Sequence, residues 1–345
     1  MTNEREVIIE NPDEASLADR MPQTRPEPDL PVSKAASMAK SILRQLSFSE
    51  EDDEACRAGL NDLVNRLCNQ QTLSGDADDF HNFVVALARK DEYALACRLL
   101  ARGLEIFPKN VDLLADYLQY GVSCGRAEEC KRYSKILMKI PRMRWTWRGF
   151  AFLVRYLLHL TEQSDSEKDI LAKRAQMLEI VADFKKYFPY SEEPYRVEAE
   201  VYQSLNEPER ESAPLRQAMS VLKVCPKCAL RYADLQFERG NYGEAMVAIQ
   251  RAIRDANQTQ SSISEGYIYY LSALCRIAMI QAGETGPDEQ VVRDVYSDFN
   301  IAIRELGEAS SYFEVIRTKT NTLVSKSGID IPPELVQLYN ACPKE

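Results

Sequence analysis

The chain has 345 residues, of which 45% are hydrophobic and 28% are charged, with only 13 glycines and a formal net charge of −10. This length exceeds what one compact core usually organises, so we expect either two domains or an elongated helical repeat array. The acid excess argues against a general nucleic-acid-binding protein, because neutralising phosphates requires clustered Lys and Arg.

Residues 1–32 are acidic and rich in proline, which is the composition of a disordered tail. The tail has no apolar segment of the kind found in secretory signals, and the apolar stretches further on are short and contain Arg. We therefore expect no membrane span and a cytoplasmic protein. Residues 33–76 predict two amphipathic helices that cap the following array. The first of them, capped by Ser33, either covers the end of the array or docks on a partner.

Three stretches of sequence, 91–108, 125–141 and 240–257, align with one another. Ala96, Cys130 and Ala245 coincide in this alignment, and Ala96 and Cys130 lie 34 residues apart. A helix with apolar residues at positions i, i+3, i+4 and i+7 stands before such stretches. The residues that define this spacing are Phe80, Phe83, Val84 and Leu87, then Trp147, Phe150, Ala151 and Val154, and then Leu271, Leu274, Cys275 and Ala278. The pattern predicts that Trp147 is a core residue and that Trp145 is half-buried.

The two best units carry small and bulky residues at shared places, namely Gly240, Tyr242, Ala245, Ile249 and Ala252, and Tyr93, Ala96, Leu100, Gly103 and Pro108. In these residues the chain resembles tetratricopeptide-repeat (TPR) proteins. The resemblance implies an all-α, right-handed α-solenoid of about six stacked antiparallel helix pairs. The repeats would span residues 77–306, with capping helices at 33–76 and 307–345. An inserted TEQSDSEK and two prolines leave the repeat register open between residues 141 and 228.

Cys225 and Cys228 form a Cys-x-x-Cys, which is typical of zinc and redox sites. A zinc site would need two more ligands, and the chain has only two His and no second Cys-x-x-Cys. A redox pair would need a βαβ context, which the sequence lacks. Pro226 follows a predicted helix as Pro108 and Pro141 follow theirs, so we interpret the motif as a turn between helix pairs with exposed thiols. We expect no metal and no cofactor.

In TPR proteins the first helix of each pair lines a concave groove. The resemblance therefore implies groove positions at His81, Asn82, Val85, Arg89, Asp116, Gln119, Arg148, Arg155, Arg196, Glu200, Arg231, Asp234 and Arg276. Trp145, beside Arg144 and Arg148, is the best surface aromatic. Since Arg recurs in most units, one hypothesis is that the groove takes an acidic peptide or a C-terminal carboxylate. The alternative is ordinary surface charge.

The sequence contains no Gly-rich phosphate loop, metal-binding His pair or nucleophile elbow, so we expect that the protein is not an enzyme. The leading hypothesis is a non-enzymatic scaffold or adaptor that binds a protein or peptide partner within a hetero-complex. One alternative is a regulatory, ligand-sensing module of a larger assembly. Another is a nucleic-acid-binding accessory protein, which the net charge disfavours.

Overall fold

The computed structural model describes residues 29–44, 50–204, 207–259, 265–286 and 289–306. Within these ranges the chain forms α-helices and one short 3-10 helix, with no strand. The predicted capping helices at 307–345, and most of the predicted tail, lie outside the described residues. The helices group into two compact units, which meet in sequence between Phe107 and Pro108.

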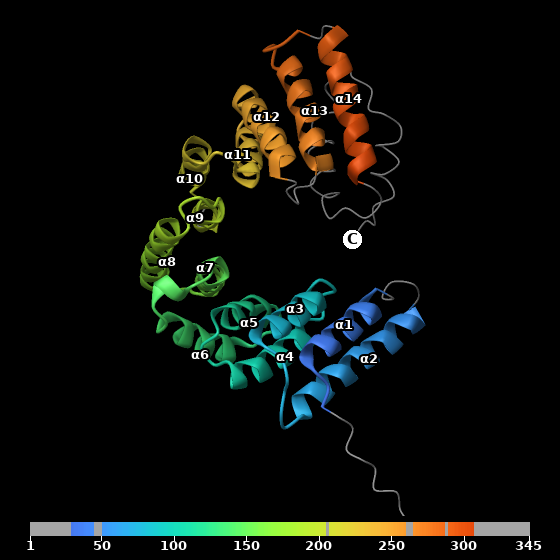
Figure 1. The fold of residues 1–345 in the computed structure, drawn as a ribbon. Helices are drawn as coiled ribbons and strands as arrows, with labels where there is room; N and C mark the ends of the chain where they lie inside the picture. The colour runs from blue at the N-terminus through green and yellow to red at the C-terminus, as the bar shows by residue number, and fades with distance from the viewer. Residues whose placement is uncertain (1–28, 45–49, 205–206, 260–264, 287–288, 307–345) are drawn as a thin grey trace, which may run out of the picture. The chain divides into compact units, whose positions relative to one another are not determined.

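The first unit contains α1 (Val32–Leu43), α2 (Glu50–Asn69), α3 (Ala77–Ala88) and α4 (Tyr93–Ile106). In this unit α1 packs against α2 and α3, and α4 packs against α2 and α3 (Figure 1). The predicted tail ends earlier than residue 32, because Leu30 is buried and both its N–H and its carbonyl pair with the side-chain amide of Gln70. Pro31, not Ser33, precedes the first turn of α1.

The second unit contains α5 (Val111–Ser123), α6 (Ala127–Met138), η3 (Arg142–Arg144), α7 (Trp147–Glu162), α8 (Glu167–Tyr187), α9 (Glu193–Ser204), α10 (Pro208–Val221), α11 (Pro226–Glu238), α12 (Tyr242–Thr259), α13 (Glu265–Gln281) and α14 (Glu289–Leu306). Odd and even helices pair in sequence, from α5 with α6 to α13 with α14, and successive odd-numbered helices also contact one another (Figure 1). Short connections make paired helices antiparallel. The predicted all-α, TPR-like stack of helix pairs is confirmed in each unit.

Side-chain oxygens at the helix starts set the repeat register. Asp76 begins α3 by accepting a hydrogen bond from the N–H of Asp79, and Asn110 begins α5 by accepting one from Leu113. These two caps lie 34 residues apart, which matches the spacing predicted from the aligned stretches. Capping oxygens satisfy backbone donors that a helix leaves unpaired at its first turn.

The core spacing predicted for α3 and α13 is confirmed, because Phe80, Phe83, Leu271 and Leu274 are all 0% exposed. The corresponding prediction for α7 is wrong at its first residue, since Trp147 is 40% exposed. α7 instead buries Phe150, Leu153, Val154 and Leu157, which is the same pattern moved by three residues. Phe150 follows the cap Thr146 by four residues, as Phe80 follows Asp76, so the cap sets the correct register.

Trp145 is buried, contrary to the prediction that it is the surface aromatic. Its side chain is 4% exposed, and its indole N–H donates to the carbonyl of Ile140 at 3.0 Å. Trp145 stands just before the cap Thr146 and packs on Phe150, with the ring centroids 5.0 Å apart. This contact is a hydrophobic staple, which fixes the direction in which the chain enters α7. Phe184 of α8 stacks on the same Phe150 ring at 5.0 Å.

Candidate functional site

The odd-numbered helices α9, α11 and α13 border a pocket of about 510 Å³, which we call the groove pocket. Its lining residues are Arg196, Ala199, Glu200 and Gln203 of α9, Glu211 of α10, Lys227, Leu230, Arg231 and Asp234 of α11, and Tyr267 of α13. Four residues predicted for the groove, Arg196, Glu200, Arg231 and Asp234, therefore do line one pocket. Their helical spacing of three to four residues places them on one face of each helix.

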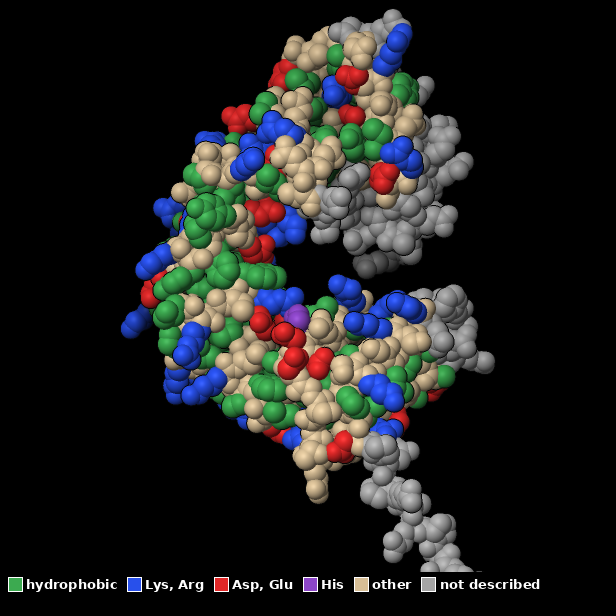
Figure 2. All heavy atoms as spheres, viewed as in Figure 1, with side chains coloured by type: hydrophobic (Ala, Val, Ile, Leu, Met, Phe, Trp, Pro, Cys, Tyr) green, Lys and Arg blue, Asp and Glu red, His purple; other side chains and the backbone are tan. Residues whose placement is uncertain are grey.

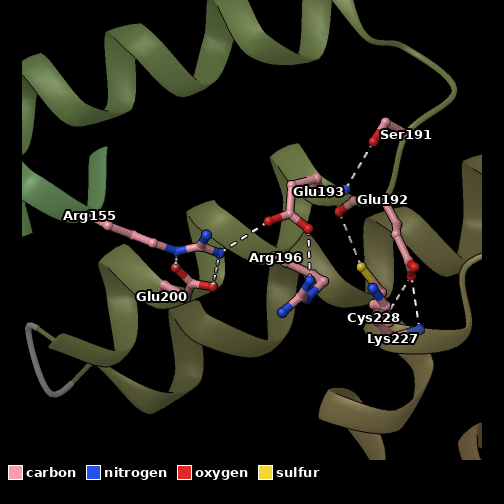
Figure 3. Close-up of polar contacts among 8 residues, drawn as sticks. All are labelled: Arg155, Ser191, Glu192, Glu193, Arg196, Glu200, Lys227 and Cys228. Carbon is pink, nitrogen blue, oxygen red and sulfur yellow. Dashed lines mark hydrogen bonds and ion pairs between the residues drawn. The ribbon is translucent and has the colours of Figure 1, made fainter. Parts of the chain in front are cut away.

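An ion-pair network runs along the edge of the groove pocket from α7 to α9 (Figure 3). Arg155 donates to both carboxylate oxygens of Glu200 at 2.8 Å and to Glu193 at 3.0 Å. Glu193 also accepts a hydrogen bond from Arg196 at 2.7 Å. Burial alone would lower the pKa of Arg155, but the hydrogen bonds and charges of the two carboxylates outweigh it and raise that pKa.

A second set of contacts holds the α11 side of the groove pocket. Arg231 donates to one oxygen of Glu211, with its Nη2 at 2.6 Å and its Nε at 3.0 Å. The Tyr267 hydroxyl donates to Asp234 at 2.5 Å and thereby joins α13 to α11. Burial, together with the adjacent Asp234 carboxylate, raises the pKa of Tyr267, which therefore stays a neutral donor near neutral pH.

The other predicted groove residues lie outside this pocket. Arg148 pairs with the fully buried Asp116 at 3.0 Å, and Arg276 pairs with Asp294 and Asp298 of α14, each at 3.2 Å. Gln119 is half-buried on α5. His81, Asn82 and Arg89 belong to the first unit, where Asn82 and Arg89 are exposed and His81 is half-buried. Trp145 is removed from the candidate surface by its burial.

Five of the six arginines predicted for the groove already have a carboxylate partner within the chain: Arg148, Arg155, Arg196, Arg231 and Arg276. Figure 2 shows the same mixing more broadly, with acidic and basic side chains interspersed over the face in view. The groove pocket therefore presents alternating charge. The sequence interpretation missed Gln203, Lys227 and Tyr267, although Gln203 and Lys227 continue the helix faces marked by Glu200 and Arg231.

The Cys-x-x-Cys lies at the start of α11, where Cys225 occupies the cap position and Pro226 the first turn. The predicted turn between helix pairs is confirmed. The predicted exposure of the thiols is wrong, because both cysteines are 0% exposed. Burial raises the pKa of Cys225 to about 11 and, aided by the nearby Glu192 carboxylate, raises the pKa of Cys228 as well. The pair thus disfavours the thiolate that redox or metal chemistry needs.

Glu192 belongs to the preceding helix pair, and it caps the start of α11. Its carboxylate accepts the N–H groups of Lys227 at 2.9 Å and Cys228 at 3.0 Å, and its carbonyl accepts the Cys228 thiol at 3.5 Å (Figure 3). On the other side, the N–H of Cys225 donates to the buried carboxylate of Asp255 at 3.0 Å. The motif therefore holds adjacent helix pairs together. In the described ranges, no three His, Cys, Asp or Glu side chains gather as a metal site.

None of the helices in the described ranges is long and apolar enough to cross a membrane. No protein-family model matches the chain, and no curated protein matches it.

Solved structures of repeat proteins do match. A TPR protein from Thermus thermophilus is 20% identical over 53% of this chain and 93% of its own, with a TM-score of 0.43. A chain of the APC/C hetero-tetramer Cut9–Hcn1 is 12% identical over 88% of this chain, with a TM-score of 0.46, and this chain spans 55% of it. Human IFIT1, in a dimer with PPP-AAAA, is 14% identical over 89% of this chain and 71% of its own, with a TM-score of 0.41. Similarity at this level carries no conclusion about function.

Proposed function

We propose that the protein is a non-enzymatic interaction scaffold that holds an extended segment of a protein partner in the groove pocket. The observation that carries this proposal is the pocket itself, which three successive odd-numbered helices line with polar side chains. Helical arrays use such continuous faces to bind peptides, because each repeat adds one helix to the same surface. A cytoplasmic location belongs to the proposal and is supported by nine cysteines scattered mostly at apolar helix positions.

The chemistry of the groove pocket favours a segment that carries both charges. Three cationic side chains, Arg196, Lys227 and Arg231, face three carboxylates, Glu200, Glu211 and Asp234. A purely acidic peptide would have to displace the carboxylates that already bind these arginines, and this is costly at Arg231, because its partner Glu211 is buried. A mixed-charge segment can add to the network without dismantling it. Gln203 and Lys227 offer further donors for peptide carbonyls, and Leu230 offers apolar contact.

The test uses a double substitution that spares the internal ion pairs. Lys227→Ala with Leu230→Ala removes two lining side chains, and Lys168→Ala with Leu171→Ala on α8 is a control with the same residues at the same helical spacing. Lys168 and Leu171 are exposed and lie outside the groove pocket. In affinity purification from the native host, we expect partner proteins to be lost with the first variant and retained with the second. Equal recovery with both variants would refute the proposal.

A further inference from the structure

The turns between helix pairs form a second pocket, of about 690 Å³, which we call the turn pocket. It lies beside the starts of α5 and α7 and the end of α6, at a different place in the second unit from the groove pocket. Val111, Ile136 and Ile140 supply its apolar lining, and all three are buried or half-buried. The exposed side chains Lys109, Lys139 and Arg144 also line it.

The cations of the turn pocket differ from the groove arginines in one respect. Among the residues that the structure describes, Lys109, Lys139 and Arg144 form no ion pair and no side-chain hydrogen bond. The one carboxylate in the lining, Asp112, already accepts a hydrogen bond from the Thr146 hydroxyl at 2.6 Å. The turn pocket therefore sets three cations against one carboxylate, which gives it an excess of positive charge on a chain whose net charge is −10.

We propose that the turn pocket docks an acidic segment of a partner protein that also carries a bulky apolar side chain. The three cations are free to pair with carboxylates, which steers association and fixes orientation. The Val and Ile side chains between them offer an apolar surface for the Leu, Ile or Phe of such a segment. This site is independent of the groove pocket, so a scaffold with both sites would hold two chemically different segments.

A protein segment suits the turn pocket better than a nucleic acid does. Single-stranded nucleic acids bind by stacking their bases on aromatic side chains, and the described lining contains none. An acidic peptide is shorter, and it can place an apolar side chain where a nucleotide would place a base.

Fluorescence anisotropy with the full chain tests the assignment. The probe is a fluorescein-labelled peptide in which a Leu-Leu pair is flanked on both sides by Glu. Combined Lys109→Glu, Lys139→Glu and Arg144→Glu should weaken its binding at least about tenfold, because three attractions become repulsions. The combined Lys→Gln and Arg→Gln changes at the same positions should weaken it less. Raising the salt concentration should also weaken it, since exposed charges are screened.

Matched controls separate the turn pocket from general charge effects. Lys168→Glu, Lys186→Glu and Lys223→Glu change the net charge equally at exposed positions outside the turn pocket, and should leave the affinity within about twofold. The groove variant Lys227→Ala with Leu230→Ala should also bind the probe normally, so failure of the groove proposal would be seen separately. Circular dichroism checks that each variant is folded.

Four results would overturn the inference. They are absence of probe binding, an equal loss in the control triple variant, unchanged affinity when Ser replaces Leu in the probe, and displacement of the probe by oligothymidylate. The last result would reassign the turn pocket to nucleic acid.

Discussion

Arg155 and Glu200 are joined by two parallel hydrogen bonds, each 2.8 Å long, which link α7 to α9. The side chains are 27% and 29% exposed, so the pair is neither a surface ion pair nor a fully buried one. A two-pronged guanidinium–carboxylate contact of this kind is stronger than a single hydrogen bond between neutral groups. The pair connects successive helix pairs, and such interfaces govern the cooperativity of a repeat array.

Replacing Arg155 with Ala should lower the free energy of unfolding by about 2 kcal/mol, between the values typical of exposed and buried ion pairs. Arg196 is the matched control, because its ion pair is with Glu193 on its own helix. Arg196→Ala should cost no more than about 0.5 kcal/mol. Urea denaturation followed by circular dichroism measures both values. Equal losses would show that the link between α7 and α9 adds nothing beyond a local ion pair.

Glu192 should make stability depend on pH in a direction unusual for a carboxylate. Burial raises its pKa above the ordinary 4.5, although the N–H groups of Cys228 and Lys227 favour the charged form. The folded state therefore binds this proton more tightly than the unfolded state does. Its stabilising contribution is complete below pH 4.5 and is lost as the pH rises through the raised folded-state pKa.

Glu192→Gln keeps an oxygen acceptor and removes the titration. The stability of this variant relative to the wild type should therefore increase as the pH is raised from about 4 to about 7. Glu207 provides a control of opposite sign, because hydrogen bonds from Arg174 lower its pKa. Glu207→Gln should lose stability relative to the wild type near neutral pH, and the difference should shrink at low pH. Thermal melts at several pH values would contradict the assignment if both variants shifted in the same direction.

The two tryptophans should report opposite environments. In Trp147→Phe the remaining Trp145, which is 4% exposed, should emit at short wavelength and resist iodide quenching. In Trp145→Phe the remaining Trp147, which is 40% exposed, should emit at longer wavelength and be quenched readily. Trp145→Ala should destabilise by about 4 kcal/mol and Trp147→Ala by less than about 1 kcal/mol, because only the former leaves a cavity. Reversed spectra would support the predicted helix register, in which Trp147 is buried.

The wrong prediction for the tryptophans shows that helical periodicity alone does not determine which residues of α7 are buried. Two sets in α7, one starting at Trp147 and the other at Phe150, satisfy the same i, i+3, i+4, i+7 spacing, so the spacing cannot choose between them. The cap decides, since Thr146 accepts from the N–H of Gly149 and makes Trp147 the first residue of the helix. Thr146 is visible in the sequence, and weighing caps together with apolar spacing would have given the correct register.

For the groove residues, the sequence predicted positions in the pocket but not the ion pairs between helices. The resemblance to TPR proteins implied groove positions at Arg196, Glu200, Arg231 and Asp234, and all four line one pocket. The ion pairs between helices were not predictable, because a contact such as Arg155 with Glu200 joins residues 45 positions apart. Such pairings depend on how consecutive helix pairs are offset. In this chain the offset places carboxylates beside arginines that the sequence suggested were free. The positive charges of these arginines are therefore neutralised within the protein.

At Gly149, α5 and α7 approach each other too closely for a side chain to fit between them. A Cβ atom at this position would lie 2.7 Å from Cγ1 of Val111, which is shorter than carbon atoms tolerate. Alanine is the better helix former by about 1 kcal/mol, so helix propensity alone predicts that Gly149→Ala stabilises the protein. Crowding in a packed interior costs about 1–3 kcal/mol, so we expect a net loss of stability.

Gly243 provides the comparison that separates propensity from packing. It lies in α12, and a Cβ atom there would have no neighbour within 4 Å. Gly243→Ala should therefore stabilise the protein by about 0.5 kcal/mol, since only the backbone entropy changes. Urea denaturation of both variants measures the two effects. If Gly149→Ala also stabilised, the two helices would have room to separate. The contact of Gly149 with Val111 would then not determine how α5 and α7 are spaced.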